Sequence, residues 1–173
     1  MEYELCIREA ETSDATALIA FLDCVGQETD LTSLDENGIM MTASEMALFI
    51  EKQAASENQI TLLALLNDEI AGILNITADQ HLRVRHIGDV FLAVRKKFWN
   101  QGLATILLEE GIEWAKASGV LRRLQLSVQK QNEAAIHLYS KMGFIIEGLQ
   151  ERGAYLAEGI FLDVCLMGKL IDE

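Results

Sequence analysis

The stretch Val94-Arg-Lys-Lys-Phe-Trp-Asn-Gln-Gly-Leu-Ala-Thr105 carries the most information about the fold. It follows the apolar run Val90–Val94 and leads directly into a segment with helical periodicity, which predicts a strand, a turn and a helix. The small residues Gly102 and Ala104 stand where that helix begins. A helix start leaves about four backbone N–H groups without intrahelical acceptors and carries roughly half a positive charge. Small side chains let an anion approach these donors, so the turn suits phosphate, although an ordinary strand-to-helix turn also uses glycine for packing.

A second segment supports the phosphate interpretation. Residues 132–144 read Asn-Glu-Ala-Ala-Ile-His-Leu-Tyr-Ser-Lys-Met-Gly-Phe and follow the apolar run Leu124–Val128. In this order and at this separation, the two segments resemble the signature segments of the GNAT superfamily of N-acetyltransferases. The family's first pattern, Gln/Arg-x-x-Gly-x-Gly/Ala, is matched by Trp99, Gly102 and Ala104. The second pattern, Asn-x-x-Ala-x-x-Leu-Tyr-x-Lys-x-Gly-Phe, is matched without a gap. With tryptophan at position 99, the chain resembles the branch of the family that includes ribosomal-protein and polyamine acetyltransferases.

The resemblance runs from Ile7 to Met167 and implies a single N-acetyltransferase domain over residues 5–173. It implies an α/β (α+β) fold, with a mixed, mostly antiparallel sheet, a splayed central pair of strands and flanking helices. The order of elements expected from the residues themselves agrees: strand, two helices, three strands, helix, strand, helix and two strands.

Hydrophobic periodicity and turn residues set the expected boundaries. The predicted strands are Cys6–Arg8, Ile60–Leu66, Glu69–Thr77, Val84–Val94, Arg123–Val128, Ile145–Gln150 and Ile160–Lys169. We expect Ser13 to cap the first helix and a polar loop to cover Gly26–Asp30. Thr42 and Glu45 form a capping box for the second helix. The third helix should end at Gly119, and the fourth should run from Asn132 to Gly143.

Composition limits the possible partners. The 173 residues carry a net charge of −13, which repels nucleic acid and anionic membranes and favours cationic ligands. No apolar run approaches the ~20 residues that cross a bilayer, and no secretory signal is expected at the N-terminus. The cysteines Cys6, Cys24 and Cys165 fit reduced thiols, so we expect a cytoplasmic protein. His81, His86 and His137 show no ligand spacing, and no metal site is expected.

The resemblance implies acetyl-CoA as the donor substrate and no metal. Family members pair the coenzyme's amide arm with the end of the strand before the turn, which a bulge in that strand opens, and hold its diphosphate on the turn. On this chain the implied contacts are Leu92, Ala93, Val94, Trp99, Asn100, Gln101, Gly102, Leu103, Ala104, Thr105 and Asn132. Asn132 has a second interpretation as a helix N-cap, and both roles can coexist.

Tyr139 is the candidate for chemistry, because a positioned phenol can protonate a departing thiolate as a general acid. It also shares a helical face with apolar residues, so packing is the competing interpretation. A base must deprotonate the acceptor ammonium, and some family members supply a glutamate from the strand before the asparagine motif. Gln125 and Ser127 stand in that stretch here, which leaves Glu28 and Asp89 as alternatives, each of which can equally be a solvated acid.

The sequence therefore predicts transfer of an acetyl group from acetyl-CoA to a primary amine by direct attack in a ternary complex. The acceptor is a small-molecule amine or a peptide N-terminus, and a homodimer is possible. The alternative is a catalytically weak or inactive acyl-CoA-binding sensor or interaction module. A nucleotide-phosphate enzyme ranks behind both, because the turn lacks the Lys-Ser/Thr of a P-loop.

Overall fold

The computed structural model of the chain describes residues 2–34, 36–157 and 159–172. Its elements follow the predicted order. The strands are β1 (Leu5–Glu9), β2 (Ile60–Leu66), β3 (Glu69–Thr77), β4 (Ile87–Val94), β5 (Arg123–Gln129), β6 (Ile145–Ala157) and β7 (Ile160–Leu170). The helices are α1 (Ala15–Glu28), α2 (Ala43–Ala54), α3 (Leu103–Ala117) and α4 (Glu133–Lys141), with short 3-10 turns η1 (Thr12–Asp14) and η2 (Lys96–Phe98).

The strands form one sheet in the order β1-β2-β3-β4-β5-β7-β6. Every neighbouring pair is antiparallel except β4 and β5, which are parallel. The prediction of a mixed, mostly antiparallel sheet is therefore confirmed. A parallel pair needs a crossover connection, and α3 supplies it between β4 and β5.

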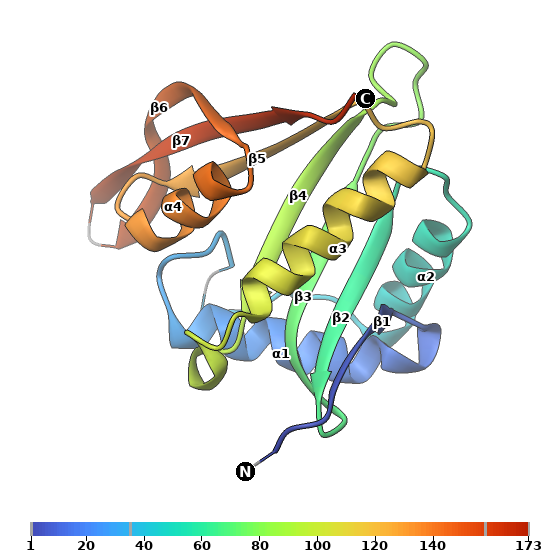
Figure 1. Cartoon of the computed structure of the whole chain (residues 1–173). Coiled ribbons are helices and arrows are strands. Elements are labelled where there is room, and N and C mark those ends of the chain that lie inside the picture. Colours follow the sequence, from blue (N-terminus) through green and yellow to red (C-terminus); the bar gives the residue numbers. More distant parts are fainter. Residues whose placement is uncertain (1, 35, 158, 173) are drawn as a thin grey trace.

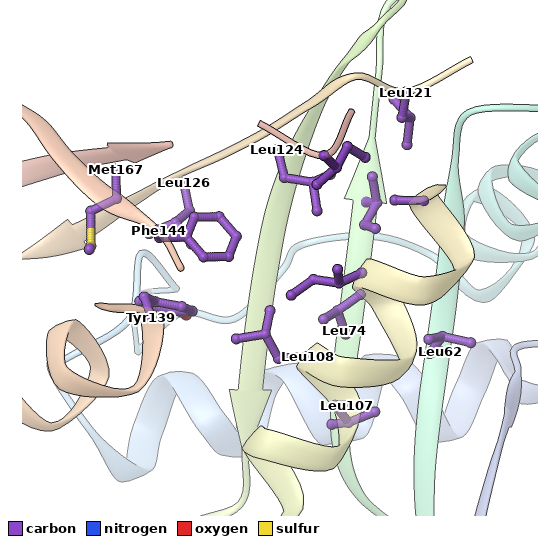
Figure 2. Close-up of a cluster of buried hydrophobic side chains, with 14 of the residues drawn as sticks. Leu62, Leu74, Leu107, Leu108, Leu121, Leu124, Leu126, Tyr139, Phe144 and Met167 are labelled. Carbon is purple, nitrogen blue, oxygen red and sulfur yellow. The ribbon is translucent and has the colours of Figure 1, made fainter. Parts of the chain in front are cut away.

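Helices cover both faces of the sheet (Figure 1). Helix α3 lies on one face, and its Gly111 comes so close to β3 that an added Cβ would stand 2.7 Å from Leu74. Helices α1 and α2 lie on the opposite face, where Leu18 and Phe21 pack in a separate apolar cluster. The larger cluster joins α3 and α4 to the sheet, and Figure 2 shows Tyr139 and Phe144 at its α4 end.

The central strands separate early. Strand β4 pairs with β5 only over Ile87–Asp89 and Arg123–Gln125, and beyond these residues β5 turns away from β4 (Figure 1). Strand β4 nevertheless continues its ladder with β3 as far as Val94, without a register shift. The expected bulge in this strand is therefore wrong, and the splay arises because β5 ends its pairing with β4 and continues with β7.

Two predictions about α1 are corrected. Ser13 does not cap it, because residues 12–14 form the 3-10 turn η1, in which Glu11 and Asp14 make the reciprocal capping contacts. The helix also continues through Gly26 to Glu28, where we expected a loop. Gly26 is buried, and the Glu28 carboxylate is held by residues at the end of β4, so tertiary contacts extend the helix.

Two strand boundaries also differ. Strand β4 begins at Ile87 rather than Val84, because residues 81–85 form turns and the buried Asn58 amide binds the Arg85 carbonyl at 2.9 Å. Strand β6 extends to Ala157 rather than Gln150 and keeps pairing with β7 through irregular register. Most of its side chains are exposed, so it lacks the alternation that reveals a half-buried strand.

Candidate active site

A cavity of about 1230 Å³ occupies the space where β4 and β5 diverge. Its walls come from the loop after α1, the end of β4, the turn before α3, the end of β5, the start of α4 and the middle of β6. The predicted residues on its walls are Leu92, Ala93, Val94, Trp99, Asn100, Gly102, Leu103, Ala104, Thr105, Asn132 and Tyr139. The chain therefore brings its two sequence motifs together on one cavity.

The turn before α3 presents backbone donors to this cavity. Asn100 and Gly102 both have left-handed φ angles, 62° and 81°, and Gly102 caps α3 without a side-chain hydrogen bond. In the described part of the chain, no backbone or side-chain acceptor takes the N–H groups of residues 100–105. An added Cβ on Gly102 would meet nothing within 4 Å. Free donors at an open helix start fit an anion such as a diphosphate.

The turn is braced against β4. The Trp99 indole Nε1 donates a hydrogen bond to the Val94 carbonyl at 2.8 Å, and the Arg95 amide donates to the Ala71 carbonyl at 2.9 Å. Phe98 is buried beneath the turn with Leu103. Tryptophan in place of the family's Gln/Arg thus fixes the shape of the turn through its indole N–H.

Strand β4 has a free edge at the cavity. Residues 90–94 pair with β3 on one side, whereas their other side has lost β5. An extended chain of amides can add to such an edge by main-chain hydrogen bonds. Leu92 and Ala93 line the cavity there, beside Leu138 of α4.

Tyr139 projects from α4 with only 8% of its surface exposed, and it lines the cavity. Its ring packs edge-on against Phe144, with 5.8 Å between centroids (Figure 2). Burial raises the pKa of the Tyr139 phenol to about 12, so the hydroxyl stays protonated at neutral pH. The structure therefore shows that Tyr139 packs in the core, and its role as a general acid stays a prediction.

Asn132 is the N-cap of α4, as predicted. Its Oδ1 accepts the Ala135 N–H at 3.2 Å, and the residue also lines the cavity. Capping therefore occupies the amide oxygen, and no described group accepts from the amide NH₂.

Three predicted site residues do not line the cavity. Gln101 is exposed on the turn. Asp89 lies at the last β4–β5 pair, where its Oδ1 accepts the Gln125 amide at 2.8 Å. Glu28 binds the Arg95 guanidinium at 2.7 Å and the Lys96 N–H at 2.9 Å. Burial opposes ionisation of Glu28, but these two donors outweigh it and hold the pKa of its carboxyl below the ordinary value.

Sequence reasoning missed two walls of the cavity. The loop after α1 contributes the acids Asp30 and Glu36, and β6 contributes Gln150 and Tyr155. Neither wall has a local motif, because long-range pairing places both: the Gln129 amide donates to the Asp30 carbonyl at 2.7 Å, and β6 follows β7. A longer predicted β6 would have placed Tyr155 opposite β7.

Metal-binding clusters and membrane-spanning helices are both absent from the residues that the structure describes. Within residues 2–34, 36–157 and 159–172, no group of three or more His, Cys, Asp or Glu side chains gathers as a metal site. In the same part of the chain, no helix has the length and apolar character needed to cross a bilayer.

Comparison with known proteins identifies the family. The model of the acetyltransferase (GNAT) family matches residues 32–144. The crystal structure of a GNAT-family acetyltransferase from Streptococcus pneumoniae is 64% identical, covers 98% of this chain and 100% of its own, and superposes with a TM-score of 0.95. The L-amino acid N-acetyltransferase AaaT of Escherichia coli K12 is 28% identical over 96% of this chain and 98% of its own. The structure of yncA from Salmonella typhimurium with its cofactor acetyl-CoA shares the fold, with 19% identity, a TM-score of 0.85 and coverage of 98% and 95%. The cavity at the splayed strands therefore belongs to a chain of the acetyltransferase (GNAT) family.

Proposed function

We propose that the protein transfers an acetyl group from acetyl-CoA to the primary amine of a small molecule or a peptide N-terminus. The observation that carries this proposal is the turn at residues 100–105, whose N–H groups are without acceptors in the described chain and most of whose residues line the cavity. A family match that spans this turn and Tyr139 supports it.

The residues present fit the coenzyme. Backbone N–H groups around Gly102 would hold its diphosphate, the free edge of β4 at Leu92–Val94 would pair with its amide arm, and the Asn132 NH₂ would donate to it. When bound, acetyl-CoA supplies a thioester that carries the acetyl group and a thiol that leaves. Residues of the turn would hold its charged end, and residues at the end of β4 and on α4 would surround its thioester.

Tyr139 has the properties of the general acid in this reaction. Its phenol keeps its proton at neutral pH because burial raises the pKa to about 12. It lines the same cavity as Leu92 and Ala93, and this shared position supports a role as proton donor to the leaving thiolate. A neutral donor that releases its proton only to a strong base suits a thiolate leaving group.

The acceptor enters a site with acidic walls. Asp30 and Glu36 line the cavity from the loop after α1, and the whole chain carries a net charge of −13. This charge attracts an ammonium, which must lose its proton before it attacks. For the base, Asp89 lies beyond the cavity wall and would act through water held against Gln125, whereas Glu28 is already bound by two donors.

Calorimetric titration with CoA, followed by thiol-release assays with acetyl-CoA and an amine panel, tests the proposal. The panel should contain diamines, amino acids and a peptide with a free N-terminus. We expect CoA to bind and at least one amine to release thiol. The proposal fails if CoA gives no heat, or if CoA binds but no amine raises thiol release above the hydrolysis rate.

A further inference from the structure

The end of α1 lies across the opening between the two separated strands. Glu28, its last residue, contacts the end of β4: one carboxylate oxygen accepts the Arg95 Nε–H at 2.7 Å and the other accepts the Lys96 backbone N–H at 2.9 Å. The Asp30 carbonyl, two residues later, accepts the Gln129 amide at 2.7 Å at the end of β5. Residues 28–30, called the strap below, therefore connect β4 to β5 where the strands no longer bond to each other.

The attachment to β4 is well anchored. The side chains of Glu28 and Arg95 are 22% and 21% exposed, so solvent screens their charges only in part. Arg95 is itself fixed to β3 by its backbone N–H to Ala71 and is 3.8 Å from Glu69, which also binds Lys97 at 2.6 Å. A charge-assisted, two-point contact of this kind restrains position as well as contributing energy.

The strap contacts both halves of the cavity. Arg95 and Lys96 begin the segment that leads into the donor turn, while Asp30 begins the cavity wall on the acceptor side. Gln129 lines the cavity and also accepts a hydrogen bond from Gln131, just before the N-cap of α4. A shift of the strap would therefore move the donor turn, the acceptor loop and the start of α4 relative to one another.

We propose that the strap positions the site: it sets the spacing of β4 and β5, and Glu28 couples the donor turn to the acceptor loop. The inference rests on the proposed acetyl transfer and assigns Glu28 a positioning role instead of a proton-transfer role. A general base must reach its substrate, whereas Glu28 does not line the cavity and each of its oxygens already accepts from a donor of the segment after β4. The low pKa of this carboxyl follows from the same contacts.

Steady-state kinetics of the Glu28→Gln variant test the proposal. The amide keeps one acceptor oxygen but turns an NH₂ group towards the other donor, so we expect the KM values for acetyl-CoA and for the amine to rise together, each about tenfold. The kcat should fall less than about threefold, and its acid limb against pH should stay in place. A base would behave differently: kcat would fall by about 10²-fold or more and the acid limb would disappear.

Controls separate the strap from general effects of substitution. Glu57→Gln removes another Glu–Arg pair, with Arg85 at 3.1 Å, away from the cavity, and should leave both KM values unchanged. Gln129→Leu removes the β5 attachment of the strap. In the double variant with Glu28→Gln, the rise in KM should be smaller than the product of the two single effects, because either change alone already releases the strap.

The possible outcomes are distinct. If wild-type protein fails to bind CoA, the proposed function fails before the strap is tested. If wild type turns over and Glu28→Gln shifts neither KM, or removes kcat and its acid limb, the strap is overturned. If Glu28→Gln does not fold, as judged by its thermal transition, Gln129→Leu decides: unchanged KM values for both substrates overturn the proposal.

Discussion

A single phenol illustrates how packing and chemistry combine at the residue scale. Tyr139 contacts Phe144 in the core and lines the cavity, and burial raises its pKa to about 12. The folded protein therefore favours the protonated phenol. Its contribution to stability is complete below the unfolded pKa of about 10 and is lost as pH rises towards 12. Between pH 6 and 9 this residue remains a proton donor, so any pH dependence of kcat there has another source.

Replacing Tyr139 by Phe should separate binding from turnover. The ring and its packing remain while the transferable proton is lost, so we expect kcat to fall by about 10²-fold and the Kd for CoA to stay unchanged. Steady-state kinetics and calorimetry measure the two effects. Tyr3→Phe is the control: this half-exposed tyrosine does not itself line the cavity, and phenylalanine keeps its ring contact with Phe98, so kcat should be unaltered. A Tyr139→Phe enzyme with full kcat would remove this phenol from the mechanism.

Two glycines of α3 form a matched pair for testing the donor turn. Gly102 at the start of α3 and Gly119 just past its end have φ of +81° and +69°, and an added Cβ would meet nothing within 4 Å at either. Alanine at each should cost about 1–2 kcal/mol in backbone strain, measured by denaturant unfolding. Only Gly102→Ala should weaken CoA binding, by about tenfold, because a methyl group then obstructs the N–H groups. Equal CoA affinities in the two variants would place the diphosphate elsewhere.

At the scale of elements, the sequence predicted correctly those turns and helix caps that depend on contacts between neighbouring residues. The hairpin between β2 and β3 turns at Asn67-Asp68, and both residues adopt positive φ, as expected of a tight turn. The capping box of Thr42 and Glu45 forms as predicted. By contrast, the end of α1 depends on a contact between residues 28 and 95, and the length of β6 depends on β7. The partners of such contacts lie in different segments of the chain, so the pattern of one segment alone cannot predict them.

The same division holds within the active site. The two sequence motifs correctly indicated that Trp99, Gly102, Asn132 and Tyr139 lie around one cavity. Each of these residues belongs to a segment whose turn or helix cap can be recognised locally. The acceptor side was not predicted, since the loop after α1 reaches the cavity only through the bond between Gln129 and Asp30. The interpretation of Glu28 changed for the same reason: its partner at Arg95 is invisible in its own segment.

Substitutions of Asn132 can separate its role as the N-cap of α4 from its proposed contact with the coenzyme. Asn132→Ala should cost about 1 kcal/mol of stability through loss of the cap, whereas Asn132→Asp keeps an oxygen for the Ala135 N–H and should remain as stable as wild type. Both variants lack the NH₂ donor, so both should bind CoA about two- to tenfold more weakly, the value of one hydrogen bond. Thermal unfolding and calorimetry decide. An Asp variant with wild-type CoA affinity would leave Asn132 as a cap alone.

At the scale of the whole molecule, charge distinguishes the two substrates. The net charge of −13 attracts a cationic diamine and repels the anionic coenzyme at distances within the screening length. That length falls from about 30 Å at 0.01 M salt to about 8 Å at 0.15 M. Of the cations near the donor turn, Arg95 and Lys97 pair with Glu28 and Glu69, whereas the Lys96 ammonium lies over the Trp99 ring, 6.0 Å from its centroid.

Association rates should therefore respond to salt with opposite signs. Raising NaCl from about 0.01 M to 0.15 M should slow capture of a diamine acceptor severalfold and speed capture of CoA. Stopped-flow measurements over this range test the prediction. Ethanolamine, with one charge, serves as the comparison and should change less than the diamine. Rates that fall for both substrates would show that local positive charge at the turn governs coenzyme entry.

The early parting of β4 and β5 has a mechanical consequence. The strand ladder between the four-stranded half of the sheet and the three-stranded half is short, with the pairs formed by Ile87–Asp89 and Arg123–Gln125. The few backbone hydrogen bonds of this ladder are therefore too sparse to fix the angle between the two halves of the sheet. Side-chain packing must therefore make this junction rigid. Gly88 is enclosed there so tightly that an added Cβ would stand 2.9 Å from Ile76 and 3.0 Å from Leu124. The short junction is thus closely packed, and a methyl group at Gly88 would push the two halves of the sheet apart.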